Sequence, residues 1–486
     1  MKKSFILSIL ATLLCSLLYA QTAEDALRFS RIFYSGTARF NGLSGAFGAV
    51  GADFSTLATN PAGLGLYSAS EMMVTLAPTV GSASSMYNDT HGSDNRVNFG
   101  VGNFGIIVNI KPYTKNNTTR LKNVNFAIGF NRQNDFNNRV VIHGVNYKSS
   151  MMKGYADSLN KLHIDSLKVM ENFQFDMGLA LGTGLIYIDS NSLYQCDAKQ
   201  GHVIQDKTIE TYGSINEFDI AVGSNFNDKL FVGMTIGVPT INYYENSLYS
   251  ESRMDNTVKY FNSLRYKYYL HTRGTGVNLK VGVIYKPAVW VRIGASIHTP
   301  TWYPNMRDEW YSSMESMFDN SSWNAIMSSP VGTYDYRLTT PFRAMGSLAF
   351  IFGQYGLFSA DYEYVNYSQA RFNSTDDSYT DVNNQIRSDF KSWGNIRVGT
   401  EWRLSNFRLR GGFAYFSNPY QSGLNNMERY QVSGGIGYRM KYFFADLTYV
   451  WSKMNQDYYL YNPSMVNPAA ITYYSNTLSA TIGLRF

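Results

Sequence analysis

The C-terminal stretch of the chain, residues 477–486, has the sequence Thr-Leu-Ser-Ala-Thr-Ile-Gly-Leu-Arg-Phe. Apolar and polar residues alternate along it, and successive side chains of a β-strand point to opposite faces. The apolar face comprises Leu478, Ala480, Ile482, Leu484 and Phe486. The stretch therefore predicts a strand with one apolar and one polar face, which ends the chain on an aromatic residue.

The same alternation recurs upstream, at residues 396–404, 407–415, 277–285 and 230–238. Soluble β-sandwiches also alternate, so one such strand does not discriminate between the two classes. Many such strands with charges on the polar face are typical of a membrane barrel, which is apolar outside and polar inside. Composition agrees, since aromatic residues make up 15% of the chain, charged residues only 16%, and the mean hydropathy is −0.24.

Residues 1–20 have the pattern of a secretory signal peptide, with Lys2 and Lys3 before an apolar run over 5–18 and a cleavage site after Ala20. A signal-anchor helix is the alternative. The mature chain keeps only Cys196, so it forms no internal disulfide. Because no other stretch reaches the ~18 apolar residues of a spanning helix, a membrane-embedded mature chain must be a closed barrel.

Short polar turns predict the number of strands. They lie at residues 111–120, 227–228, 286–288, 353–355, 405–406 and 439–441. Each short turn joins two strands, and the first and last strands end on the same side of the membrane, so six turns predict 14 antiparallel strands. An even number of strands with short turns at one end is typical of outer-membrane barrels. Residues 134–207 are expected to form one long outer loop with a helix near 151–170. Residues 172–188 alternate like a strand but are placed in that loop, because the strand count must stay even.

Residues 40–66 do not resemble the wall. They are rich in Gly and Ala, contain one acid, Asp53, and end in Asn60-Pro61-Ala62-Gly63. Small residues let backbones approach closely, and the Asn-Pro pair predicts a turn. The expected architecture is all-β, with a signal peptide at 1–20, an N-terminal hatch at 21–69 inside the lumen, and a transmembrane barrel at 70–486.

With hatch and wall in place, the chain resembles the FadL family of outer-membrane transporters for fatty acids and other hydrophobic compounds. The motifs that carry the resemblance are Asn60-Pro61-Ala62-Gly63, residues 297–301, residues 340–343 leading to 361–364, and residues 399–419. The resemblance implies a 14-stranded barrel with a hatch. It also implies lateral release of the solute through a gap made by a kinked third strand. That strand is expected at 121–131, where Gly129 and Asn131 would permit the kink.

Two further sets of residues are candidates for function. An apolar ligand groove in the long outer loop would be lined by Met151, Met152, Tyr155, Phe173, Phe175, Met177 and Leu179, although these residues also suit a loop packed against itself. A charge ladder would face the lumen and hold the hatch to the wall through Asp361, Glu363, Arg397, Glu401, Arg403, Arg408, Arg410 and Asp446. In the hatch itself, Asp53 and the segment from Asn60 to Gly63 are the gating candidates.

The predicted function is passive transport of hydrophobic small molecules, such as long-chain fatty acids, across the outer membrane of a Gram-negative bacterium. The expected partners are the solute, outer-membrane lipids and the barrel-assembly machinery, which would recognise the last strand through Phe486. No basic run suggests nucleic acid, no catalytic motif suggests an enzyme, and no cofactor or metal is expected. The alternatives are a haem-binding barrel using His143, His163 or His202, and a structural or adhesive barrel whose hatch never opens.

Overall fold

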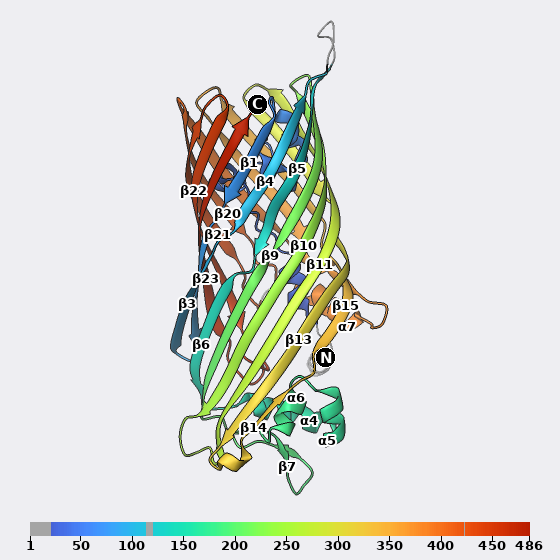
Figure 1. Cartoon of the computed structure of the whole chain (residues 1–486), viewed down its shortest axis with the longest axis vertical. Coiled ribbons are helices and arrows are strands. Elements are labelled where there is room, and N and C mark those ends of the chain that lie inside the picture. The colour runs from blue at the N-terminus through green and yellow to red at the C-terminus, as the bar shows by residue number, and fades with distance from the viewer. Residues whose placement is uncertain (1–20, 113–119, 422) are drawn as a thin grey trace.

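The computed structural model describes residues 21–112, 120–421 and 423–486. They form an antiparallel β-barrel that is much longer than it is wide (Figure 1). The predicted signal peptide lies outside the described residues, as does most of the predicted turn at 111–120. Within the described residues, no helix has the length and apolar character needed to cross a lipid bilayer.

Fourteen described strands follow one another around the wall at the end of the barrel that carries the C-terminus. In order they are β1 (Glu71–Leu76), β4 (Val101–Ile110), β5 (Leu121–Asp135), β9 (Val203–Phe226), β10 (Leu230–Arg253), β11 (Phe261–Ala288), β12 (Val291–His298), β16 (Arg343–Phe352), β17 (Gly356–Asn366), β19 (Ser392–Leu404), β20 (Phe407–Phe416), β21 (Arg429–Arg439), β22 (Phe443–Tyr458) and β23 (Ala469–Arg485). The register of β1 with β23, from Glu71 opposite Arg485 to Leu76 opposite Ala480, closes the barrel. The predicted fold class and strand number are confirmed.

Toward the opposite end the wall is completed by further strands. They are β2 (Thr79–Tyr87), β3 (Thr90–Asn98), β6 (Asn138–Asn146), β13 (Trp302–Phe318), β14 (Ala325–Ser328), β15 (Gly332–Thr339) and β18 (Arg371–Asn373). Three of the interruptions fall at Pro78, Pro300 and Pro341. Proline has no N–H for the ladder, so a strand breaks or bends there. A helix, α7 (Thr380–Asp389), and two 3₁₀ turns, η4 (Ser321–Trp323) and η5 (Tyr367–Gln369), connect strands in this half.

The two faces of the wall differ as the alternation predicted. On β23, Ile482 is 55% exposed on the outside, whereas Ser479 and Thr481 are buried inside. The same division holds on β10, where Val232, Met234 and Ile236 point outward and Gly233 and Thr235 point inward. Exposed apolar side chains on so many neighbouring strands are what a lipid-facing surface requires.

The turns distinguish the two ends of the barrel. We call the end with the β9–β10, β16–β17 and β19–β20 turns the short-turn end and the other the long-loop end. The predicted turns at 353–355 and 405–406 are where the strands reverse. The turn predicted at 286–288 instead lies at Val289 and Trp290, because β11 continues through Ala288, and the one predicted at 439–441 lies one residue later.

The long outer loop is shorter than predicted. It spans residues 147–202 rather than 134–207, because the third wall strand resumes as β6 and β9 already starts at Val203. The loop contains α4 (Met151–Leu162), α5 (Ser166–Asn172), α6 (Met177–Gly182) and a small hairpin, β7 (Tyr187–Ile188) with β8 (Tyr194–Gln195). Residues 172–188 therefore belong to the loop, as expected, and contribute no wall strand.

The N-terminal region fills the lumen between the strands. It contains α2 (Ala23–Ser30), α3 (Ala38–Gly42), η2 (Phe54–Ala58) and η3 (Pro61–Leu66), and most of its residues are buried. In Figure 1 these blue segments lie within the barrel, behind its front strands. This region is the hatch that the Gly- and Ala-rich composition predicted.

Candidate functional site: the hatch and the lumen cavities

Asn60 organises the last segment of the hatch. Its Oδ1 accepts a hydrogen bond from the Ala62 N–H at 3.1 Å, which caps η3, and Pro61 occupies the first position of that turn. Its Nδ2 donates to the carbonyls of Gly48 at 2.6 Å and Val283 at 3.3 Å. One amide therefore links two hatch segments to strand β11.

Replacing Asn60 with alanine is expected to loosen this segment. Loss of a cap costs about 1 kcal/mol, and here two carbonyl partners are lost as well. We expect faster amide hydrogen exchange over residues 48–66 and altered solute uptake, with normal barrel assembly. Asn366→Ala is the control, because Asn366 caps η5 in the same way outside the hatch. Wild-type exchange and uptake in Asn60→Ala would contradict the assignment.

Asp53 lies within the hatch and is not part of a link to the wall. Its carboxylate accepts hydrogen bonds from the Thr37 hydroxyl at 2.8 and 2.9 Å and from the Ser55 N–H at 3.0 Å. The hatch residue that pairs with the wall is Arg39, which sequence analysis did not single out. Asp53 thus joins the start of α3 to the start of η2.

Glycines of the wall let the hatch backbone approach the strands. A Cβ at Gly233 on β10 would overlap the Pro61 carbonyl and lie 2.6 Å from the Ala62 nitrogen. A Cβ at Gly223 would lie 2.7 Å from the Leu64 Cβ, and one at Gly399, across the barrel, would lie 2.6 Å from the Leu43 Cβ. The hatch is therefore seated directly on wall backbone, with no room for a side chain between them.

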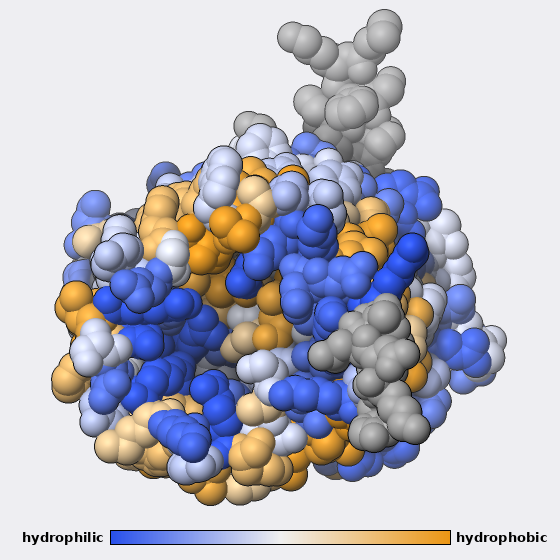
Figure 2. Space-filling view, turned by 90° about the horizontal axis from the view of Figure 1, so that it is seen from above, coloured by the Kyte–Doolittle hydropathy of each residue, from blue (hydrophilic) through white to orange (hydrophobic). Residues whose placement is uncertain are grey.

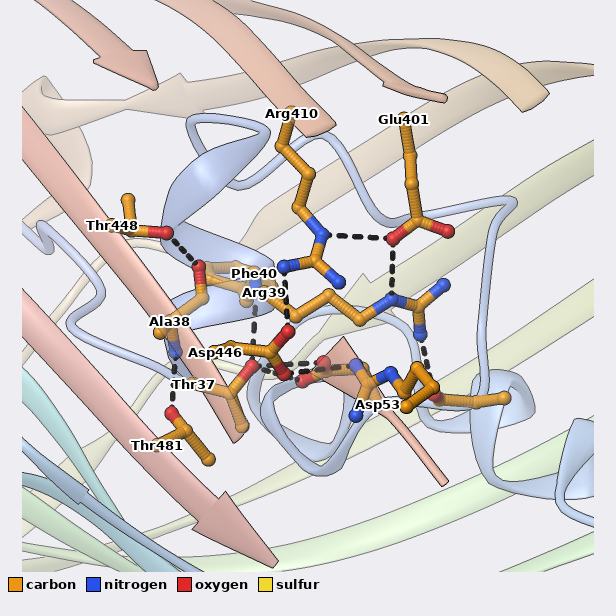
Figure 3. A network of polar contacts seen from close by, with 12 residues as sticks. Thr37, Ala38, Arg39, Phe40, Asp53, Glu401, Arg410, Asp446, Thr448 and Thr481 are labelled. Atoms are coloured by element: carbon orange, nitrogen blue, oxygen red, sulfur yellow. Dashed lines mark hydrogen bonds and ion pairs between the residues drawn. The ribbon is translucent and has the colours of Figure 1, made fainter. Parts of the chain in front are cut away.

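Buried ion pairs connect the hatch to the wall at one level. The Glu401 carboxylate on β19 accepts from the hatch residue Arg39 at 3.0 Å and from Arg410 on β20 at 2.8 Å (Figure 3). Arg410 also donates to Asp446 on β22 at 2.7 Å. These pairs bring three of the predicted ladder residues together, with Arg39 as their hatch partner.

A second network lies around Glu363 on β17. Its two oxygens accept from Arg343 at 2.9 Å and from Arg397 at 2.5 Å, and Arg343 also donates to the Ser30 carbonyl of the hatch. Asp361, on the same strand, accepts from the Gly48 N–H of the hatch at 2.9 Å. Arg343 belongs to a quoted motif, but sequence analysis did not place it in the ladder. Arg403 and Arg408, the other two predicted ladder residues, lie half-exposed at the short-turn end.

A third network of buried ion pairs was not predicted from the sequence. Lys280 on β11 contacts Glu217 and lies 3.3 Å from Asp219, both on β9, and all three side chains are buried. The alternation of β11 already placed Lys280 on the polar face. Its acidic partners are more than sixty residues away in sequence, so only the strand order brings them together.

The residues predicted to line a ligand groove form a packed core. Met151, Met152, Met177 and Leu179 are buried, with Tyr155 and Phe173 against them. Phe175 packs on Trp310 of β13 at a ring distance of 5.4 Å. These contacts hold the outer loop on the barrel, and the cavities described next are lined by other residues.

Two cavities lie between the hatch and the long-loop half of the wall. The larger, of 430 Å³, is lined by hatch residues of α2 and by a set of tyrosines from the wall: Tyr243, Tyr268, Tyr420, Tyr458 and Tyr473. The smaller, of 140 Å³, reaches the start of β2 at Thr79 and Gly81. Both are lined by Phe33, Asn134, Asp135, Asn138, Arg429, Met454 and Tyr473. Because they share these lining residues, the two cavities are neighbours. The larger lies next to α2 in the lumen, and the smaller lies next to β2 in the wall.

The wall is interrupted where the smaller cavity meets it. In the described residues, β3 forms a ladder with β2, and β6 forms one with β9, but no ladder joins β3 to β6. The link between β2 and β6 instead uses side chains, with the Ser85 hydroxyl donating to the Val141 carbonyl at 2.6 Å. A barrel wall without a backbone ladder is weaker at that position.

The break in the third strand is not at the predicted residues. Gly129 and Asn131 lie in a regular ladder opposite Gly105 and Asn103 of β4. The irregularity begins between Arg132 and Asn134, and the strand stops after Asp135 and resumes at Asn138. Gly129 serves a different purpose, because a Cβ there would lie 2.6 Å from the ring of Phe54 in the hatch.

Two arginines at the junction of the cavities lack acidic partners. Arg31 of the hatch donates to the Met427 carbonyl at 2.9 Å, and Arg429 of β21 donates to the Ser452 hydroxyl at 3.0 Å. Their guanidiniums lie over Phe33, at 4.9 and 4.2 Å from the ring centre. Neither is within ion-pair distance of a described carboxylate. The junction thus combines aromatic surface with two arginines that have no ion-pair partner among the described residues, although the Asp135 carboxylate lines the same two cavities.

Comparisons with known proteins agree on the architecture. No protein-family model matches the chain, and no curated protein matches it in sequence. Among solved structures, a Pseudomonas aeruginosa FadL homologue superposes with a TM-score of 0.56 at 12% identity, over 93% of this chain and 98% of that one. The Pseudomonas putida toluene transporter TodX superposes with a TM-score of 0.52 at 10% identity, over 92% of this chain and 97% of that one. The Ralstonia pickettii toluene transporter TbuX superposes with a TM-score of 0.50 at 14% identity, over 92% of this chain and 98% of that one. The chain therefore has the FadL fold, a closed fourteen-stranded antiparallel barrel whose lumen is occupied by an N-terminal hatch.

Proposed function

We propose that this protein is an outer-membrane channel through which hydrophobic small molecules, such as long-chain fatty acids, diffuse passively and leave sideways into the membrane. The observation that carries the proposal is the pair of neighbouring cavities that leads from the tyrosine-lined lumen to the interrupted wall. The fold that the chain shares with a FadL homologue and two toluene transporters supports the same function.

The orientation follows from the two ends of the barrel. Outer-membrane barrels have short turns in the periplasm and longer loops outside. The short-turn end would then face the periplasm, and the loop that carries α4, α5 and α6 would face the medium. The C-terminal strand, which ends at the exposed Phe486, would be the segment recognised by the barrel-assembly machinery.

A route past the hatch, rather than through it, fits the contacts. The hatch is seated on wall glycines and held by buried ion pairs, so large displacements would break several contacts at once. The cavities lie on the long-loop side of these contacts. A solute that moves from the larger cavity to the smaller one reaches the junction of β3 and β6, where no backbone ladder joins the described strands, while the hatch stays in place.

The lining of the route favours amphiphiles. Aromatic rings offer apolar surface, and each methylene transferred from water contributes about 0.8 kcal/mol. A carboxylate headgroup would find Arg31 and Arg429, which have no acidic partner among the described residues. Long-chain fatty acids have both parts, an apolar chain and an anionic head.

Replacing Gly81 with phenylalanine is expected to block the route. Gly81 lines the smaller cavity, and a Cβ there would lie 3.3 Å from the Asn137 carbonyl, so the ring would fill the cavity beside the junction of β3 and β6. Uptake of a fluorescent long-chain fatty acid by proteoliposomes should fall close to the level of empty liposomes.

Gly346→Phe is the matched control. Gly346 is on the lipid-facing side of β16, and nothing lies within 4 Å of a Cβ built there. This variant should transport like wild type, with the same heat-dependent gel mobility as evidence of folding. If Gly81→Phe folds and still transports at the wild-type rate, the lateral route is wrong.

A further inference from the structure

A third cavity opens at the short-turn end of the barrel, on the far side of the hatch from the proposed route. It has a volume of 260 Å³ and is lined by hatch residues together with residues of β1, β19, β20, β21, β22 and β23. Figure 2 views the barrel from this end and shows hydrophilic residues gathered around a hollow. Its charged lining consists of Arg39, Arg403, Arg408, Arg439, Arg485, Asp53, Glu71, Glu401 and Asp446.

The four carboxylates of this cavity already have partners. Glu71 accepts from Arg485 at 2.5 and 2.8 Å, and Glu401 accepts from Arg39 and Arg410. Asp446 lies 2.7 Å from Arg410 and 2.9 Å from Arg439. The Asp53 carboxylate accepts hydrogen bonds within the hatch, from the Thr37 hydroxyl and the Ser55 N–H. No acidic group of the described lining is left to neutralise a further arginine.

Two arginines of the lining have no described carboxylate within hydrogen-bond distance, and Arg403 has only a long ion pair with Glu401. The Arg403 Nε lies 3.7 Å from the shared Glu401, beyond hydrogen-bond distance. The Arg408 guanidinium donates only to the carbonyls of Ser405 and Phe407, at 2.6 and 2.7 Å, and has no described carboxylate within ion-pair distance. Behind them, the buried Nη2 of Arg410 has no hydrogen-bond partner among the described residues. The lining thus has more arginines than carboxylates, and the Arg408 guanidinium has no described carboxylate to neutralise it.

We propose that this cavity is a binding site for one phosphate or carboxylate group, held by Arg403 and Arg408. A guanidinium presents parallel N–H donors that match such an oxyanion, and these charge-assisted bonds are stronger than neutral ones. The group can belong to a free anion or to the headgroup of a single-chain amphiphile. The proposal rests on the charges of this cavity alone and does not depend on the transport route.

Calorimetric titration of the protein in a neutral detergent tests the site. Inorganic phosphate and lysophosphatidic acid are the two probes. We expect saturable binding of one ligand per chain, weakened about tenfold or more in the double variant Arg403→Gln/Arg408→Gln. Each single variant should lose part of that affinity. Arg265→Gln, which removes an exposed arginine of β11, should bind like wild type.

The two probes separate the sources of the anion. Comparable binding of both supports a site for the free anion, and binding of lysophosphatidic acid alone supports a headgroup site that needs the attached chain. The proposal is overturned if neither probe binds saturably. It is also overturned if the double variant, folded by its gel mobility, binds as tightly as wild type. Gly81→Phe should leave this binding unchanged, so failure of the transport proposal and of this one can be told apart.

Discussion

Replacing Gly233 with alanine is expected to displace the hatch and to make the barrel leak small polar solutes. The added Cβ would overlap the Pro61 carbonyl and approach the Ala62 nitrogen to 2.6 Å. These are backbone atoms, so no rotamer change removes the clash, and overpacking of this kind costs about 1–3 kcal/mol. Sugar efflux from proteoliposomes should rise, and amides of residues 52–66 should exchange faster with solvent.

The wall offers graded controls for this prediction. At Gly282 the nearest atom is the Asn60 side-chain oxygen, which can move more easily than backbone, so Gly282→Ala should have a smaller effect. Gly346→Ala adds the same methyl group on the lipid side, where nothing lies within 4 Å, and should behave like wild type. Equal efflux and exchange in all three variants would show that the hatch is not seated on these glycines.

The wall could be predicted from the sequence because its cause is local. Lipid outside and a polar interior impose a two-residue period on each strand, and the stretch at 477–486 shows that period in full. The turns at 353–355 and 405–406 follow from the same pattern, because the alternation stops there. Where a strand ran a few residues further, as β11 does to Ala288, the predicted turn was displaced by the same amount.

The partners inside the barrel could not be predicted in this way. Arg39 and Glu401 are 362 residues apart, and only the closure of the barrel and the path of the hatch bring them together. Lys280 could be placed on the polar face from its own strand, whereas its pairing with Glu217 reaches across β10 to β9 and depends on the order of the strands. An alternation specifies a face, not a neighbour.

The break in the third wall strand and the packing of the outer loop show two other limits of prediction from the sequence. Gly129 suggested flexibility, but its small size admits the Phe54 ring, and the strand breaks after Asp135 instead. The Met-rich segment after residue 150 suits a ligand groove and a packed core equally well by composition. Whether such residues enclose space depends on how the helices sit on β13 and β14, which no local pattern reports.

Replacing Glu363 with glutamine is expected to be the most destabilising single change in the lumen. The substitution keeps the size of the side chain but removes the charge between Arg343 and Arg397, both buried. A buried ion left without its partner costs about 3–5 kcal/mol, far more than the intact pair contributes. Arg343 also holds the Ser30 carbonyl, so α2 of the hatch should loosen together with the wall.

The expected loss can be measured as a lower midpoint of thermal unfolding in detergent and as proteolytic cleavage near residue 30. Glu315→Gln is the matched control, because Glu315 on β13 pairs with Arg265 at 3.7 Å near the surface, where such pairs contribute about 0–1 kcal/mol. Adding Arg397→Met to Glu363→Gln should recover part of the loss, since it removes one of the two orphaned charges. If Glu363→Gln proves no more destabilising than Glu315→Gln, the network around Glu363 does not hold hatch to wall.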